Sequence, residues 1–205
     1  EVEVLHEPNE RYFLHVSTTR DHQWVLLGCH SKQTSTVHAV DANEPEKSPQ
    51  LIRPRKDNVE YHVGHRKGAF YILHNDGAQN FMIVKRDVTA LTHEEEIVVP
   101  HQEHVYLTDI DLFDQHLVVS ERFNGLPRRC VIDLKTMAQH HIKMPEEVYD
   151  IGGAWNPNAT STAYRFTYTS PTTPRSVIYY DMETTEQKVL KVQPVLGGFT
   201  SDAYT

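Results

Sequence analysis

Ser170-Pro-Thr-Thr-Pro-Arg-Ser-Val-Ile-Tyr-Tyr-Asp181 is the stretch of sequence that decides the fold. Its two prolines and two threonines disfavour a helix, and the Val-Ile-Tyr-Tyr run that follows favours an extended chain. Asp181 can accept hydrogen bonds from the backbone of the next turn. The same order of turn, strand and closing aspartate occurs earlier, in Ser31-Lys-Gln-Thr-Ser-Thr-Val-His-Ala-Val-Asp41. The recurrence indicates that the chain repeats one β-rich unit.

Two landmarks keep the same period along the chain. Apolar strands begin at positions 24, 70, 116 and 164, which are 46, 46 and 48 residues apart. The aspartates that close the following strands have the same spacing: Asp41, Asp87, Asp133 and Asp181. A period near 45 residues with four short strands per unit is typical of a β-propeller blade. The sequence therefore predicts an all-β chain, a β-propeller of about four blades with four antiparallel strands each. An immunoglobulin-like sandwich also has short strands, but it lacks this repeat.

The predicted blades cover residues of about 8–54, 57–100, 103–144 and 146–192, within a propeller region 1–192. Residues 2–7 are expected to form the outer strand of a preceding blade. Residues 193–205 contain glycines and a proline and are expected to form a linker. Short runs of Val, Ile, Tyr and Phe between turn residues mark the strands. The predicted strands are residues 12–16, 24–28, 35–40, 50–52, 60–63, 70–74, 81–84, 96–99, 105–108, 116–120, 130–132, 140–143, 148–151, 164–168, 177–180 and 188–191.

The repeated aspartates are predicted to cap turns through their side chains, rather than to form a ring of carboxylates. Second strands are nearly all apolar, as expected for strands between neighbouring blades. First strands are more mixed, and in a propeller the innermost strand lines the central channel. Polar groups such as His62 and Thr108 are therefore expected to face water.

No catalytic motif is visible in the sequence. It contains no Gly-x-Ser-x-Gly, no P-loop and no Gly-x-Gly-x-x-Gly, so no catalytic residue and no cofactor are predicted, and the substrate-binding residues stay unknown. Among the 14 histidines, the pairs His62/His65, His101/His104 and His140/His141 have a spacing that could suggest a metal. Residues one or three apart on a strand point to opposite faces, so no metal site is predicted.

Composition excludes two classes of partner. The net charge of −8 argues against nucleic acid, because that affinity comes largely from Lys and Arg. No apolar run approaches the roughly 18 residues that a membrane helix needs. Cys29 and Cys130 lie in strand-like runs and are expected to be buried free thiols of a cytoplasmic protein, with a single disulfide as the alternative.

Several segments, in order along the chain, resemble the propeller domain of oligopeptidase B enzymes, which are serine peptidases of the prolyl oligopeptidase family. They include Thr34–Asp41, Arg53-Pro-Arg55 with Glu60-Tyr61, Phe70–Leu73 with Gly77–Phe81, Leu112-Phe113 with Leu117–Arg122 and Gly125-Leu126, Tyr168–Pro174 with Asp181, and Val189–Lys191 with Gly197-Gly-Phe199 and Tyr204.

The resemblance implies a seven-bladed propeller that caps an α/β-hydrolase domain, of which this chain matches about the last four blades. It also implies that the catalytic Ser, Asp and His lie in that hydrolase domain, beyond the segment like Gly197-Gly-Phe199. No family catalytic residue therefore maps onto this chain, which alone is expected to be inactive. The implied parent enzyme cleaves short peptides after Arg or Lys, with the propeller limiting access.

Two other functions remain open. One is a self-contained four-bladed propeller that binds a protein or peptide, which the repeat alone permits. The other is a metalloenzyme that uses the histidines. A partial propeller would leave two apolar blade faces uncovered, and such patches promote association, so self-association is expected.

Overall fold

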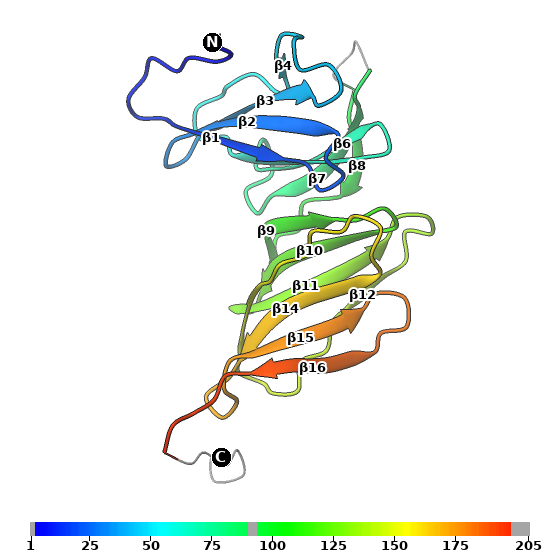
Figure 1. The fold of residues 1–205 in the computed structure, drawn as a ribbon. Helices are drawn as coiled ribbons and strands as arrows, with labels where there is room; N and C mark the ends of the chain where they lie inside the picture. The colour runs from blue at the N-terminus through cyan, green and yellow to red at the C-terminus, as the bar shows by residue number, and fades with distance from the viewer. Residues whose placement is uncertain (1–2, 90–93, 198–205) are drawn as a thin grey trace. The chain divides into compact units, whose positions relative to one another are not determined.

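All regular elements of the protein are β-strands (Figure 1). The computed structural model describes residues 3–89 and 94–197. Within those ranges there is no helix, and thus none suited to crossing a membrane. Four four-stranded sheets follow one another, and strands adjacent in sequence are adjacent in each sheet. This is the blade pattern that the sequence predicts, and each predicted strand has a counterpart, with ends shifted by a few residues.

The strand bounds are as follows. The first sheet contains β1 (Phe13–Thr18), β2 (Trp24–His30), β3 (Ser35–Asp41) and β4 (Gln50–Leu51). The second contains β5 (Tyr61–Arg66), β6 (Ala69–His74), β7 (Met82–Asp87) and β8 (Glu96–Val99). The third contains β9 (Val105–Leu112), β10 (His116–Phe123), β11 (Leu126–Asp133) and β12 (Gln139–His141). The fourth contains β13 (Asp150–Gly153), β14 (Ala163–Thr169), β15 (Ser176–Asp181) and β16 (Gln187–Val192).

The repeated aspartates occupy one register position and cap their turns, as predicted. Each lies opposite the first residue of the preceding strand, in the pairs Trp24–Asp41, Ala69–Asp87, His116–Asp133 and Ala163–Asp181. The backbone N–H groups of Glu183 and Thr184 donate to Asp181 Oδ1 at 2.9 and 2.8 Å. The other three aspartates accept equivalent bonds from residue i+2. The shared period thus reflects a shared hairpin geometry.

The turn that precedes β15 is held by a carboxylate from outside the motif. Glu146 accepts hydrogen bonds from Ser170 Oγ at 2.7 Å, from Thr173 Oγ1 at 2.9 Å, and from the hydroxyls of Thr172 and Tyr168. The hydroxyls of Ser170, Thr172 and Tyr168 favour the ionised carboxylate and lower the pKa of Glu146 to about 2. The Ser170 and Thr173 hydroxyls of the Ser-x-x-Thr-Pro element therefore bind the Glu146 carboxylate, which holds the turn.

The chain divides into two compact units, Glu1–Leu112 and Phe113–Thr205, and each has its own core. Unit 1 packs its first two sheets together through Leu26, Val37, Ala39, Ile52, Tyr61, Phe70, Ile72 and Val84. The core of unit 2 contains Phe113, Val118, Val131, Ile142, Ile151, Tyr164, Phe166, Tyr168, Ile178, Tyr180 and Met182. Phe70, Ile72 and Leu73 of β6 are fully buried, which agrees with the prediction that second strands are packed on both faces.

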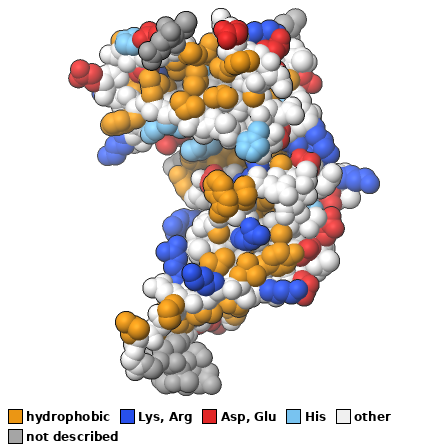
Figure 2. All heavy atoms as spheres, viewed as in Figure 1, with side chains coloured by type: hydrophobic (Ala, Val, Ile, Leu, Met, Phe, Trp, Pro, Cys, Tyr) orange, Lys and Arg blue, Asp and Glu red, His pale blue; other side chains and the backbone are white. Residues whose placement is uncertain are grey.

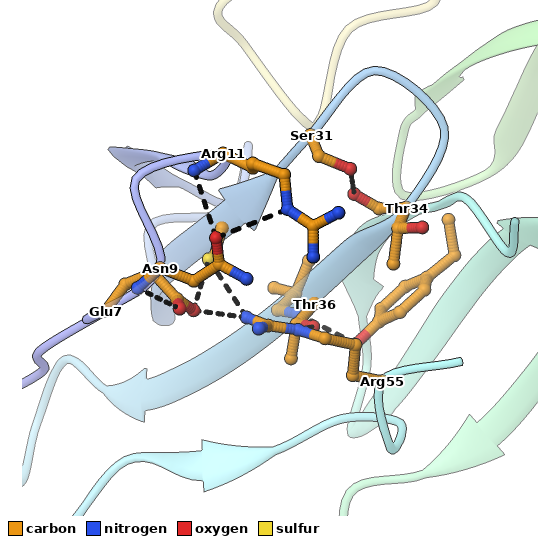
Figure 3. A network of polar contacts seen from close by, with 10 residues as sticks. Glu7, Asn9, Arg11, Ser31, Thr34, Thr36 and Arg55 are labelled. Atoms are coloured by element: carbon orange, nitrogen blue, oxygen red, sulfur yellow. Dashed lines mark hydrogen bonds and ion pairs between the residues drawn. The ribbon is translucent and has the colours of Figure 1, made fainter. Parts of the chain in front are cut away.

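The prediction of an outer strand at residues 2–7 is wrong for its described part. Residues 3–9 contain no strand. Instead the Glu7 carboxylate pairs with Arg55 and accepts a hydrogen bond from the Cys29 thiol at 3.1 Å (Figure 3). These side-chain contacts hold the segment without backbone pairing. At the other end, residues 193–197 contain no strand, as expected for a linker, and residues 198–205 lie outside the described residues.

Both cysteines are buried free thiols, as predicted, and the alternative of a disulfide is wrong.

Candidate functional site

Unit 1 contains a cavity of about 480 Å³ that opens along the first strands of its sheets. Strands β1, β5 and β9 supply much of the wall, and β2, β3 and Arg20 of the β1–β2 loop supply the remainder. The lining residues are His15, Ser17, Arg20, Leu26, Gly28, Cys29, His30, Ser35, Thr36, Val37, Tyr61, His62, Val63, Gly64, Asp109, Ile110 and Leu112. Strands β5 and β9 have both buried and exposed residues, whereas every residue of β1 is exposed.

Three histidines give the cavity its polar character. His15 Nδ1 lies 3.2 Å from His30 Nδ1, and the two rings meet edge to face at 5.0 Å. His62 lines the same cavity from β5. Burial, and then the nearby His30 and His62, lower the pKa of His15. Two facing imidazole nitrogens can share one proton but not two, so this pair favours the neutral state of His15. Figure 2 shows histidine side chains gathered over unit 1.

The position of His15 depends on a glycine. A Cβ atom at Gly28, the residue opposite His15 in the β1–β2 register, would lie 2.0 Å from His15 Cε1. Real Cβ contacts are never so short, so the ring occupies the space that a side chain at position 28 would fill. Glycine at this position thus allows the imidazole to lie flat over β2 and to reach His30.

One wall of the cavity is charged. Arg20 forms an ion pair with Asp111, and both side chains are about one-fifth exposed. Asp109 lines the cavity from the same strand, two residues earlier. Asp109 is thus the carboxylate that β9 contributes to the cavity wall, while Asp111, which is not one of the lining residues, pairs with the lining residue Arg20.

The base of the cavity is structural. Ser35 Oγ donates to the Tyr61 carbonyl at 3.1 Å and accepts from its N–H at 2.6 Å. The Tyr61 hydroxyl accepts from the Val37 N–H at 2.8 Å and donates to the Arg53 carbonyl at 3.0 Å. The Ser35 hydroxyl is therefore engaged with the backbone and is not placed as a nucleophile. The cavity therefore presents imidazoles, the Arg20 guanidinium, the Asp109 carboxylate and several apolar side chains.

The strand argument holds for His62/His65 and His140/His141, whereas His101 and His104 lie between β8 and β9 and belong to no strand. His62 is exposed, whereas His65 is buried and bonds to Asp21 at 2.7 Å. His140 Nε2 contacts the Tyr180 hydroxyl at 2.6 Å, and His141 Nε2 contacts Glu121 at 2.8 Å. Neither pair brings its two imidazoles together. Thr108 is exposed on β9, as expected for a first strand.

Sequence reasoning missed the pairing of His15 with His30. These residues are 15 apart in sequence, and only the register of β1 against β2 shows that they meet. The predicted strand 12–16 contains His15, but the predicted strand 24–28 ends two residues before His30, whereas β2 includes it.

The two arginines of the Arg53-Pro-Arg55 segment, which resembles oligopeptidase B, form ion pairs and hydrogen bonds within the fold. Arg53 forms two hydrogen bonds with Glu95, at 3.0 and 2.5 Å. Arg55 donates to Thr36 Oγ1 at 2.9 Å, pairs with Glu7, and lies 4.0 Å above the Tyr12 ring. Figure 3 shows this network, in which Arg55 reaches from Thr36 to Glu7. The motif therefore ties loops to the first sheet and adds no reactive group.

Comparison with known proteins places these features in a family. Residues 1–193 match the family model described as "Prolyl oligopeptidase, N-terminal beta-propeller domain". The dipeptidyl aminopeptidase BI of Pseudoxanthomonas mexicana is 30% identical over 95% of this chain and 27% of its own length. Protease 2 of Moraxella lacunata is 26% identical over 96% of this chain and 28% of its own length.

Solved structures show the same fold. Oligopeptidase B from Trypanosoma brucei superposes with a TM-score of 0.88 at 24% identity, over 96% of this chain and 29% of that protein. Oligopeptidase B from Leishmania major superposes with a TM-score of 0.89 at 22% identity, over 97% of this chain and 30% of that protein. The chain thus spans less than a third of the length of each of these four proteins. The four sheets are β-propeller blades.

Proposed function

Because this chain belongs to the prolyl oligopeptidase family, within its N-terminal β-propeller domain, we propose that it is the non-catalytic propeller part of a serine peptidase and limits which peptides reach the catalytic domain. The observation that carries this proposal is the match of the propeller model over residues 1–193, together with four consecutive blades. Its partner is an α/β-hydrolase domain of the same protein, which supplies the nucleophile.

The cavity of unit 1 supports a role in peptide contact. First strands of blades face the channel of a propeller, and His15, His62 and Asp109 lie on such strands. A peptide that passes them meets hydrogen-bonding imidazoles and a carboxylate. Because folded proteins do not enter a narrow channel, the proposed enzyme acts on short, flexible peptides.

We further propose that the parent enzyme prefers peptides with Arg or Lys at the cleavage site and works in the cytoplasm. The net charge of −8 supports the preference, because a negative surface attracts cationic peptides and raises their association rate. Because salt screens this attraction, the association rate of basic peptides should fall as the ionic strength rises.

The test compares two proteins: the 205-residue chain, and the longest protein encoded by its source reading frame. Each is incubated with matched short peptides that contain Arg, Lys or Glu at one position, and with a folded protein rich in Arg. We expect no hydrolysis by the 205-residue chain. We expect the longer protein to cleave after Arg and Lys and to leave the folded protein intact.

Three results would contradict the proposal. Cleavage of the folded protein as fast as the peptides would remove the limiting role. Equal cleavage of the Glu peptide would remove the preference for basic residues. If the reading frame encodes no hydrolase segment and its protein binds peptides without cleaving them, a free-standing binding propeller is favoured instead.

A further inference from the structure

Three side chains with metal-binding atoms meet on one face of the third sheet. Cys130 of β11 is opposite His141 of β12 in the strand register, and it is also opposite Val119 of β10. Glu121 lies two residues beyond Val119 and so points to the same face. A carboxylate oxygen, the thiol sulfur and an imidazole nitrogen all lie within 4.8 Å of one another. The sheet ladder fixes this arrangement, because all three residues belong to paired strands.

We propose that Glu121, Cys130 and His141 bind one Zn²⁺ ion. Thiolate, imidazole and carboxylate are the ligands that zinc takes in proteins, at bond lengths of about 2.0–2.3 Å. A tetrahedron with such bonds places its ligand atoms about 3.3–3.8 Å apart, so small side-chain shifts are enough to close the site. Three protein ligands leave the fourth position to water.

The surroundings of the cluster fit an ion that enters from solvent. The His141 side chain is 46% exposed, whereas that of Glu121 is 5% exposed. An ion therefore meets the imidazole first and the buried carboxylate and thiol afterwards. Upon binding, the Cys130 thiol releases its proton to solvent and the ion gives up water. Carboxylate and thiolate together then balance the two positive charges of the metal.

Arg128 is placed to support the carboxylate in the bound state. Its Nε lies 3.2 Å from Glu121 Oε1, and its terminal nitrogen donates to Oε2 at 3.3 Å. His141 Nε2 contacts Oε1, so Oε1 faces the cluster. With Oε1 on the metal, Oε2 keeps its bond to Arg128. Such an outer partner orients a metal-bound carboxylate.

The other thiol of the chain provides a matched control. Cys29 is also buried, and its sulfur lies 3.1 Å from a Glu7 oxygen and 3.2 Å from a terminal nitrogen of Arg55. Like Cys130, it therefore lies in a group that contains a carboxylate and a guanidinium. Among the described residues, however, no third ligand completes a metal-binding group there. A site that needs His141 will therefore distinguish the two cysteines.

The test is a titration of the purified protein with Co²⁺, a spectroscopic substitute for Zn²⁺, followed by absorption. We expect one equivalent to bind, with a near-ultraviolet band from thiolate-to-cobalt charge transfer that Zn²⁺ abolishes. Cys130→Ser should remove the band, and Cys29→Ser should leave it unchanged. Loss of a group that only orients a metal ligand already weakens binding about 10-fold or more, so His141→Asn, which removes one of the three ligands, should weaken binding at least about 10-fold.

The proposal is overturned if no thiolate band forms, if Cys29→Ser removes it, or if His141→Asn binds as tightly as the parent. Circular dichroism checks the fold of each variant. Because nearly half of the His141 side chain is exposed, its replacement leaves the core intact, and this variant decides the question if Cys130→Ser does not fold.

Discussion

The Glu146 carboxylate offers a quantitative test of how the turn before β15 is held, through the substitution Glu146→Gln. Four hydroxyls donate to this carboxylate. A hydrogen bond to an ionised acceptor contributes about 1.5–3 kcal/mol to stability, against about 0.5–1.5 kcal/mol for a neutral one. The amide has one acceptor oxygen, so it can keep only two of the four bonds, in their weaker neutral form, and its NH2 group cannot accept from the other two hydroxyls. If the site were dry, the loss would be at least about 1 kcal/mol per bond. Glu146 is only half-buried, and solvent screening reduces the total to about 1–2 kcal/mol.

The loss should depend on pH in a defined direction. The pKa of Glu146 is about 2 in the folded protein, against an ordinary value of 4.5. Since the folded pKa is the lower one, the ionised carboxylate stabilises the fold fully above pH 4.5, and this stabilisation disappears as the pH falls towards 2. The difference between parent and Glu146→Gln should therefore be largest at pH 7 and should shrink between pH 4.5 and 3.

Urea denaturation followed by circular dichroism, at pH 7, 4 and 3, measures both quantities. Glu147→Gln is the matched control, because Glu147 is the exposed neighbour of Glu146 and should change stability little. A loss for Glu146→Gln that is the same at pH 7 and pH 3 would refute the assignment of the effect to the charged carboxylate. An equal loss for Glu147→Gln would show that net charge, and not the hydroxyl contacts, is responsible.

Three further substitutions test other parts of the chain. Gly28→Ala should fold but displace the His15 ring, so NMR titration should show the pKa of His15 rising towards its ordinary value; an unchanged titration would contradict the contact. Asp181→Ala should cost about 1 kcal/mol in urea denaturation through two lost turn bonds, and Asp181→Asn, which keeps an oxygen acceptor, less. Val16 is 71% exposed and belongs to the uncovered apolar strand β1. Light scattering should therefore show that the protein self-associates and that Val16→Glu weakens the association. A parent protein that is monomeric at all concentrations would contradict this.

The repeat in the sequence was sufficient to predict the sheets. Apolar runs and closing aspartates recur 46, 46 and 48 residues apart, and the structure explains this by placing each aspartate opposite the start of the preceding strand. Turn chemistry and strand alternation are local properties, so the sequence contains them directly. The same locality allowed the faces of His62 and His65 to be assigned correctly.

Contacts between strands were beyond the reach of such reasoning. Glu121, Cys130 and His141 are 9 and 11 residues apart in sequence, and only the pairing of three strands brings them together. A search confined to neighbouring histidines misses a group of this kind. The N-terminal segment gives the opposite error. Residues 2–7 were predicted as a strand, but residues 3–9 contain none, and the Glu7 side chain contacts Arg55 and Cys29 instead. Propensity is a weak guide where tertiary contacts decide.

The order of strands within the sheets has a consequence for how the chain reaches its native state. Because each strand pairs with the strand next to it in sequence, every hairpin can close over a short loop at a small cost in chain entropy. Phe13 and His30, for example, are the most distant partners of β1 and β2, and only 17 positions separate them. Low contact order of this kind favours rapid folding. A ribosome that has released one blade has released all the strands that its sheet requires, so the blades can form in the order of their synthesis.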